Sequence, residues 1–144
     1  MEFRQKFSIL LPNQVGKQQL KTIVIRERQF QVIESHCFDA YPEEACGLLT
    51  GSNSSETHHV HVAHALPNIA DGERRRRYEI SATDYLKIER DAAARGQEVI
   101  GVFHSHPNGQ ARPSQADLEL AWPQLAYVIL AVSESSKREC RCFE

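Results

Sequence analysis

Blocks of apolar and polar residues along the chain predict strands separated by helices. The apolar run at 126–132 and the nearly apolar segment 98–103 each indicate a buried strand. Residues 28–41 carry apolar side chains at helical spacing and stop before Pro42, so they predict an amphipathic helix. By the same criteria, strands are expected at 22–25, within 42–51, and at 56–66 and 137–143, and helices at 81–95 and 114–121.

This order of elements predicts an α/β domain with a mixed sheet flanked by helices. The length of 144 residues favours one domain that can bury a core of its own. Residues 1–21 have a mixed composition and are interrupted by Pro12 and Gly16, and we interpret them as an N-terminal extension. The domain itself is then expected to span residues 22–144.

Residues 101–117 place four side chains with metal-binding or capping chemistry in one short stretch, GVFHSHPNGQARPSQAD. Side chains two positions apart in a strand point the same way, so His104 and His106 are expected on one face. The Pro-Asn-Gly that follows ends the strand, and Ser114 is suited to cap a helix with Asp117 in its first turn. Two imidazoles and one carboxylate leave a fourth position open on a tetrahedral zinc ion, which is typical of catalytic zinc sites.

Each half of this stretch also has a simpler explanation. A His-x-His pair is common on solvated strands, and Ser-x-x-Asp is an ordinary capping pattern. The complete string, with His-x-His-Pro, seven residues between His106 and Ser114, and then Ser-x-x-Asp, resembles the JAMM motif of the JAMM/MPN+ zinc metalloproteases. The resemblance spans roughly residues 22–143 and implies a further strand at 78–80. It implies an MPN-type (cytidine-deaminase-like) domain with a curved mixed sheet, and one Zn²⁺ per chain held by His104, His106 and Asp117.

A second signature of the same family lies within 42–51. Glu44 stands two residues before a Cys-Gly pair, at the position of the family's glutamate, although Glu43 and Glu44 could equally be surface carboxylates of a loop. The resemblance implies that Glu44 takes a proton from water and later gives one to the leaving amine. It also implies that Ser114 steadies the oxyanion of the tetrahedral intermediate. Cys46 has no His or Asp motif around it, so we expect a packing role.

Three clusters lie outside these motifs. Four histidines within 56–66 have no carboxylate or cysteine at ligand spacing, which favours a strand surface and leaves a weak transition-metal site as the alternative. The run Arg74–Arg77 is either a solvated charge cluster or a patch that docks an acidic partner or a terminal carboxylate. Cys140 and Cys142 share one face of the last predicted strand, where packing is favoured over half of a metal site.

Composition narrows the class of protein. Apolar residues make up 41% and charged residues 25%, as in ordinary globular domains, and the net charge of −2 gives no general attraction to nucleic acid or acidic membranes. The four cysteines form no C-x-x-C pair, and the sequence has neither a signal peptide nor a membrane-spanning apolar run. We therefore expect a cytoplasmic protein with free thiols that binds neither nucleic acid nor a membrane.

The compact chain most resembles the small prokaryotic MPN enzymes. In the Mec-type members the substrate is a ubiquitin-like sulfur-carrier protein with a C-terminal amino-acid adduct, whose release serves sulfur transfer leading to cysteine. The resemblance thus implies a zinc peptidase or isopeptidase, with the carrier tail added to a sheet edge. Two alternatives stay open: a non-catalytic MPN scaffold, which zinc content would distinguish, and a RadC-like DNA-associated protein, which salt-dependent DNA binding would distinguish.

Overall fold

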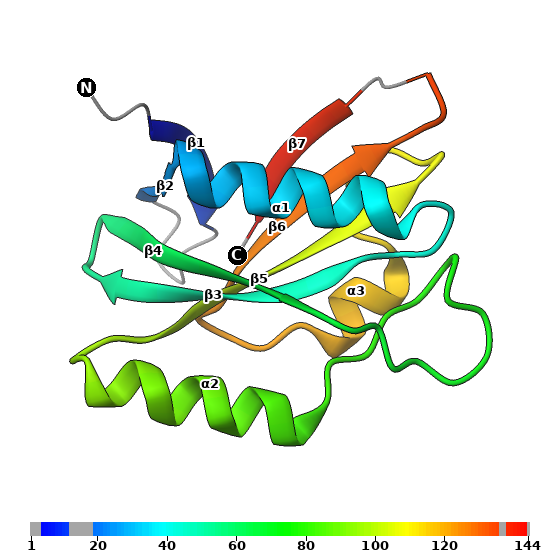
Figure 1. Cartoon of the computed structure of the whole chain (residues 1–144). Helices are drawn as coiled ribbons and strands as arrows, with labels where there is room; N and C mark the ends of the chain where they lie inside the picture. Colours follow the sequence, from blue (N-terminus) through cyan, green and yellow to red (C-terminus); the bar gives the residue numbers. More distant parts are fainter. Residues whose placement is uncertain (1–3, 12–18, 136–137, 144) are drawn as a thin grey trace.

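The computed structural model describes residues 4–11, 19–135 and 138–143, which form one sheet and three helices (Figure 1). The strands are β1 (Arg4–Leu11), β2 (Gln19–Arg26), β3 (Cys46–Asn53), β4 (Thr57–Leu66), β5 (Glu98–Pro107), β6 (Ala126–Val132) and β7 (Arg138–Phe143). The helices are α1 (Glu27–Ala40), α2 (Ala82–Ala94) and α3 (Gln115–Leu120). None of the helices in these segments is long and apolar enough to cross a membrane.

The seven strands form a single mixed sheet in the order β1-β2-β4-β3-β5-β6-β7. The pairs β2/β4 and β5/β6 are parallel, and the other neighbouring pairs are antiparallel. Parallel neighbours require a crossover, and α3 lies within the crossover from β5 to β6, whereas α1 and β3 lie between β2 and β4. The predicted α/β domain with a mixed sheet flanked by helices is confirmed.

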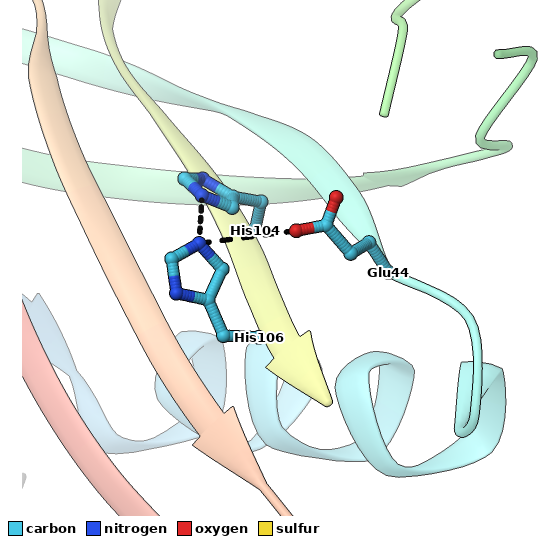
Figure 2. A group of neighbouring side chains, drawn as sticks. All are labelled: Glu44, His104 and His106. Carbon is cyan, nitrogen blue, oxygen red and sulfur yellow. Dashed lines mark hydrogen bonds and ion pairs between the residues drawn. The ribbon is translucent and has the colours of Figure 1, made fainter. Parts of the chain in front are cut away.

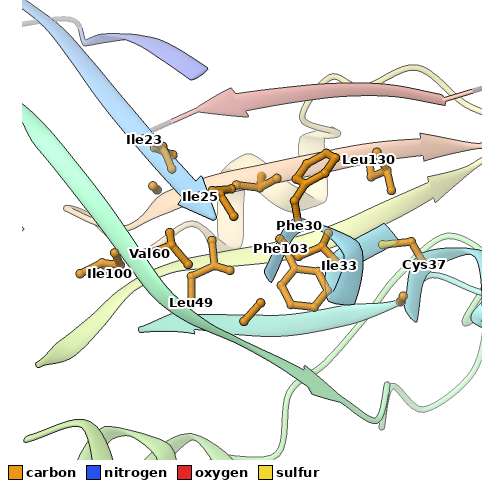
Figure 3. Packing of buried hydrophobic residues seen from close by; sticks show 14 of the residues in the cluster. Ile23, Ile25, Phe30, Ile33, Cys37, Leu49, Val60, Ile100, Phe103 and Leu130 are labelled. Carbon is orange, nitrogen blue, oxygen red and sulfur yellow. The ribbon is translucent and has the colours of Figure 1, made fainter. Parts of the chain in front are cut away.

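Helix α1 packs across one face of the sheet and builds the larger core (Figure 3). Its apolar positions Phe30, Ile33 and Cys37 are buried there, at the helical spacing that the sequence shows. They meet inward-facing residues of β2, β3, β4, β5 and β6, with Phe103 of β5 among the largest fully buried side chains. Because Phe103 faces α1, alternation along β5 sends His104 to the opposite face.

Helix α2 covers part of that opposite face. Tyr85 and Ile88 of α2 pack against a small core of buried Leu48, Val102 and Tyr127. Val102 is the residue of β5 that precedes His104 on the same face, so the apolar core beneath α2 continues directly into the histidine pair. The position of the histidines is therefore set by the register of a buried strand.

The predicted and observed elements differ in two places. Residues 78–80 were expected to form a strand, but they lie in an irregular segment, because their backbone meets the loop after β4 only through isolated hydrogen bonds such as that from the Ile69 N–H to the Glu79 carbonyl. Residues 4–11 form β1, which pairs antiparallel with β2 along the sheet edge, although no strand was expected there. The proposed boundary between an extension at 1–21 and a domain at 22–144 stays a prediction.

Candidate active site

The histidine pair of β5 lies at the carboxyl end of that strand. His104 and His106 point to the same side, and their Nε2 atoms are 3.1 Å apart (Figure 2). His104 is fully buried, while His106 is partly exposed. Neighbouring β3 and β6 pair with β5 on both sides, Cys46 with His104 and Ile129 with His104, so the backbone that carries the pair is rigidly held.

Asp117 comes to the pair from the first turn of α3. Its Oδ2 atom lies 3.2 Å from His104 Nε2 and 3.0 Å from His106 Nε2. The same oxygen accepts a hydrogen bond from the Ser114 N–H at 2.8 Å, and the Asp117 N–H donates to the Ser114 hydroxyl at 3.1 Å. This reciprocal capping box fixes the start of α3 and aims the carboxylate at the histidines.

Glu44 approaches from the loop after α1, on the other side of the histidines. The residue is only 4% exposed, and its Oε1 atom is 3.8 Å from His106 Nε2 (Figure 2). Its Oε2 atom is buried and has no hydrogen-bond partner within the described part of the chain. Main-chain hydrogen bonds position it: the Glu44 N–H donates to the Arg74 carbonyl, and the next N–H, that of Ala45, donates to the Ser105 hydroxyl.

The four side chains have shifted pKa values with distinct causes. Burial raises the pKa of Glu44 to about 8, against the opposing effect of His106. Burial also lowers the pKa of His104. For His106 burial acts in the same direction, but the hydrogen bonds to Asp117 and to the Gln110 carbonyl outweigh it and raise the pKa. Burial alone would raise the pKa of Asp117, yet the two imidazoles hold it well below its usual range.

The donor set fits a metal ion such as zinc. His106 Nδ1 lies 2.8 Å from the Gln110 carbonyl oxygen, to which it can only donate, so in the neutral imidazole the lone pair is on Nε2. That lone pair faces the Asp117 carboxylate and His104 Nε2, an arrangement that needs a proton or a cation between the three atoms. Glu44, His104 and His106 also offer ligand atoms that lie within 4.8 Å of one another. Imidazole nitrogens with a carboxylate oxygen are ligands that zinc accepts.

The structure thus brings together four of the five predicted site residues through their side chains. The fifth, Ser114, is exposed and uses its hydroxyl as a helix cap, while its backbone N–H binds the Asp117 carboxylate. The capping interpretation of Ser114 is confirmed. Its part in stabilising an oxyanion, like the roles of Glu44, His104, His106 and Asp117, stays a prediction.

Two further residues contact the site and were not among the predicted site residues. The ring of Tyr78 stacks on His104, with ring centroids 4.5 Å apart and an angle of 27° between planes. The side-chain amide of Asn68 donates to the carbonyl of Glu44 at 3.0 Å. Tyr78 follows the arginine run and Asn68 follows Pro67, and neither position has a local pattern that points to β5 or to Glu44.

The remaining clusters lie outside this group of side chains. His59 and His61 flank Val60 on β4, and Cys46 is fully buried with its Sγ 3.6 Å from the Pro67 carbonyl oxygen. Burial raises the pKa of Cys46 to about 12, so the thiol stays protonated, in agreement with a packing role. Cys140 and Cys142 on β7 pack against the larger core. A docking role for the arginine run stays a prediction.

Comparisons with known proteins identify relatives of this chain. The Prok-JAB family, described as prokaryotic homologs of the JAB domain, matches residues 26–143. A desampylase of Haloferax volcanii is 36% identical over 89 residues, which cover 61% of this chain and 62% of that protein, less than two thirds of its length. A CysO-cysteine peptidase of Mycobacterium tuberculosis is 27% identical over 123 residues, covering 84% of this chain and 81% of the peptidase.

Two solved structures share the fold. The solution structure of a protein from Desulfitobacterium hafniense superposes with a TM-score of 0.71 at 32% identity, covering 81% of this chain and 79% of that one. A protein from Salinibacter ruber gives a TM-score of 0.58 at 36% identity, with coverage of 81% and 76%. The chain therefore belongs to the Prok-JAB family, as its resemblance to the small prokaryotic JAMM/MPN proteins predicts.

Proposed function

We propose that this protein is a zinc-dependent peptidase or isopeptidase that hydrolyses an amide at the C-terminus of a ubiquitin-like protein. The observation that carries the proposal is the convergence of His104 Nε2, His106 Nε2 and Asp117 Oδ2 within 3.2 Å of one another. Buried Glu44 lies beside them with one carboxylate oxygen lacking a partner among the described residues. This combination of a three-ligand site and an adjacent free carboxylate suits metal-assisted hydrolysis.

The proposed ligands are His104, His106 and Asp117. Zinc in such a site supplies Lewis-acid chemistry, polarising a carbonyl oxygen and lowering the pKa of water to about 7. The protein prepares the ligands itself: the Gln110 carbonyl fixes the proton of His106 on Nδ1, and the Ser114 N–H orients the Asp117 carboxylate. With these two hydrogen bonds in place, His106 Nε2 and Asp117 Oδ2 point toward each other and toward His104 Nε2.

Glu44 is the proposed general base and acid. A buried carboxyl group with a pKa raised to about 8 holds and releases protons near neutral pH, as an acid–base group must. Its position beside His106 places it to accept a proton from the attacking water and to return one to the leaving amine. The metal's own positive charge would favour the ionised carboxylate at the start of the reaction.

Ser114 is the proposed donor to the oxyanion. Its hydroxyl oxygen accepts the hydrogen bond from the Asp117 N–H, which leaves the hydroxyl proton available to donate elsewhere. Capping holds the side chain at the edge of the site, so the two roles are compatible.

The relatives point to the substrate class. The names desampylase and CysO-cysteine peptidase both describe enzymes that act on protein conjugates. We extend this to a ubiquitin-like sulfur-carrier protein, with cleavage releasing a C-terminal amino acid in a route to cysteine. An extended carrier tail is easily accepted at such a site because its backbone can be bound with little side-chain selectivity.

A paired substitution tests the function. Wild-type protein loaded with zinc is incubated with a ubiquitin-like carrier that bears a C-terminal cysteine, or with one joined to a lysine side chain, and the released product is measured by mass spectrometry. Glu44→Gln should abolish cleavage while bound zinc remains near one per chain. Glu43→Gln, at the exposed neighbouring carboxylate, is the matched control and should retain activity. Cleavage by Glu44→Gln at the wild-type rate would disprove the assignment.

A further inference from the structure

The side-chain amide of Asn68 is fully occupied by hydrogen bonds beside the site. Its Nδ2 group donates to the carbonyl oxygens of Glu44 and Arg77, each at 3.0 Å. Its Oδ1 atom accepts from the N–H groups of Ala70 at 3.0 Å and Glu79 at 3.1 Å. Two donated and two accepted bonds use the whole capacity of an amide side chain.

These four bonds join two segments that reach the histidine pair from different parts of the chain. One is the Glu44 loop, whose N–H also donates to the Arg74 carbonyl at 2.8 Å. The other is the segment around Tyr78, which lies between two residues bound by Asn68 and stacks on His104. Asn68 therefore links the backbone that carries the Glu44 carboxylate to the backbone on both sides of Tyr78. The ring of Tyr78 in turn covers the buried His104.

Glu44 depends on its backbone for its position. The Oε2 atom has no partner among the described residues, and Oε1 approaches His106 Nε2 only to 3.8 Å. The backbone is fixed at Ala45, whose N–H and carbonyl both bind Ser105 of β5. The carbonyl of the same peptide group, that of Glu44, accepts its hydrogen bond from Asn68.

We propose that Asn68 is a positioning residue, which holds the Glu44 carboxylate at its distance from the histidine pair by tying its backbone to the 77–79 segment. This inference rests on the proposed function for its kinetic consequences. A misplacement of a catalytic group by about 1 Å can cost about 100-fold in rate. Loss of the Asn68 bonds should therefore reduce turnover more than substrate binding.

Two substitutions separate the functions of the amide. Asn68→Ala removes all four bonds. Asn68→Asp keeps an oxygen that can accept from Ala70 and Glu79 but has no hydrogen to donate to Glu44 or Arg77. We expect both variants to lower kcat about 10- to 100-fold with less than about a threefold change in KM, and to bind zinc as the wild type does.

The matched control is Gln29→Ala. Gln29 sits on α1, and its Oε1 accepts a hydrogen bond from the Ala63 N–H at 2.9 Å, so this variant also removes an amide that satisfies a backbone group. Helix α1 packs on the face of the sheet opposite the histidine pair, so Gln29→Ala should leave kcat unchanged. Equal loss of kcat in Gln29→Ala and Asn68→Ala, or wild-type kcat in both Asn68 variants, would overturn the inference.

Amide hydrogen exchange gives a readout that needs no substrate. In full-length Asn68→Ala we expect the N–H groups of Glu44, Ala70 and Glu79 to exchange at least about 10-fold faster, while Phe103 in the middle of β5 is unchanged. Wild-type exchange at Glu44 would contradict the positioning role. If the wild-type enzyme releases nothing from the carrier, the proposed function fails, and the exchange rates still decide the role of Asn68.

Discussion

The ring of Tyr78 lies flat against the imidazole of His104, with 4.5 Å between centroids. His104 is fully buried, and Tyr78 belongs to the smaller core beneath α2. The aromatic ring therefore keeps bulk water from the side of one proposed ligand, and it links the apolar core to the site.

This contact predicts different results for two substitutions. Tyr78→Phe keeps the ring and should leave zinc affinity within about threefold of the wild type, whereas Tyr78→Ala should weaken it about 10-fold or more because His104 loses its cover. Tyr78→Ala should also lower the free energy of unfolding by about 1–3 kcal/mol, less than the cost at a fully buried aromatic site. Competition with a chromophoric chelator and urea unfolding measure the two effects. Equal zinc affinities for the two variants would contradict the covering role.

Asp117→Asn should separate helix capping from metal binding. The amide oxygen can still accept from the Ser114 N–H, but the negative charge facing the two imidazoles is lost. Loss of a residue that only hydrogen-bonds a metal ligand can reduce metal affinity by roughly 100-fold. Because Asp117 is itself a proposed ligand, we expect the zinc affinity of Asp117→Asn to fall by more than this. Glu43→Gln removes an exposed carboxylate and serves as the control in the same chelator titration. Retention of tight zinc binding by Asp117→Asn would exclude this carboxylate as a ligand.

Gly47 is expected to be intolerant of any side chain. A Cβ at this position in β3 would collide with the carbonyl oxygen of His64 and with the ring of Phe103. Gly47→Ala should therefore lower the free energy of unfolding by about 1–3 kcal/mol or more, as overpacking of a core does. At Gly109 an added Cβ would meet only ordinary contacts, the nearest being the His106 Cβ at 3.5 Å. Gly109→Ala should therefore unfold at close to the wild-type urea concentration. A similar loss of stability in Gly47→Ala and Gly109→Ala would contradict the steric explanation.

His64 should contribute to acid sensitivity away from the site. Its Nε2 atom lies 2.8 Å from the Thr50 hydroxyl oxygen, and burial, helped by Arg95, lowers its pKa. The imidazole of His64 therefore binds a proton more readily in the unfolded chain than in the folded protein. Its contribution to stability is complete above about pH 6.5 and is lost as the pH falls below that value. His64→Gln, whose amide can still bind Thr50, should lose less stability than the wild type between about pH 6.5 and 5.

Urea unfolding at several pH values checks this prediction. His59→Gln, at an exposed position of the same strand, is the control for replacing a histidine by glutamine. If the free energy of unfolding depended on pH in the same way for His64→Gln and the wild type, His64 would not contribute to the acid sensitivity.

The parts of the fold that sequence could predict are those with local patterns. Alternation along β5 placed His104 and His106 on one face, and the capping pattern placed Asp117 in the first turn of a helix. Asn68 and Glu44, by contrast, are 24 positions apart, and their contact depends on how the loop after β4 meets the loop after α1. The stacking of Tyr78 on His104 is equally non-local, and the strand that the family resemblance implied at 78–80 was wrong. Such contacts carry no periodicity that a reader of the sequence can detect.

Helix α3 has six residues, none of them buried, and so short a helix has little stability of its own. Its first turn is held by the same Asp117 oxygen that faces the imidazoles. If Asp117 is a metal ligand, as proposed, ordering of α3 and occupancy of the site form one coupled equilibrium: a bound metal would stabilise the helix, and the free energy of ordering the helix would reduce the metal affinity. Helix propensity at solvent-facing positions of α3 consequently becomes a means of adjusting metal affinity without changing a ligand.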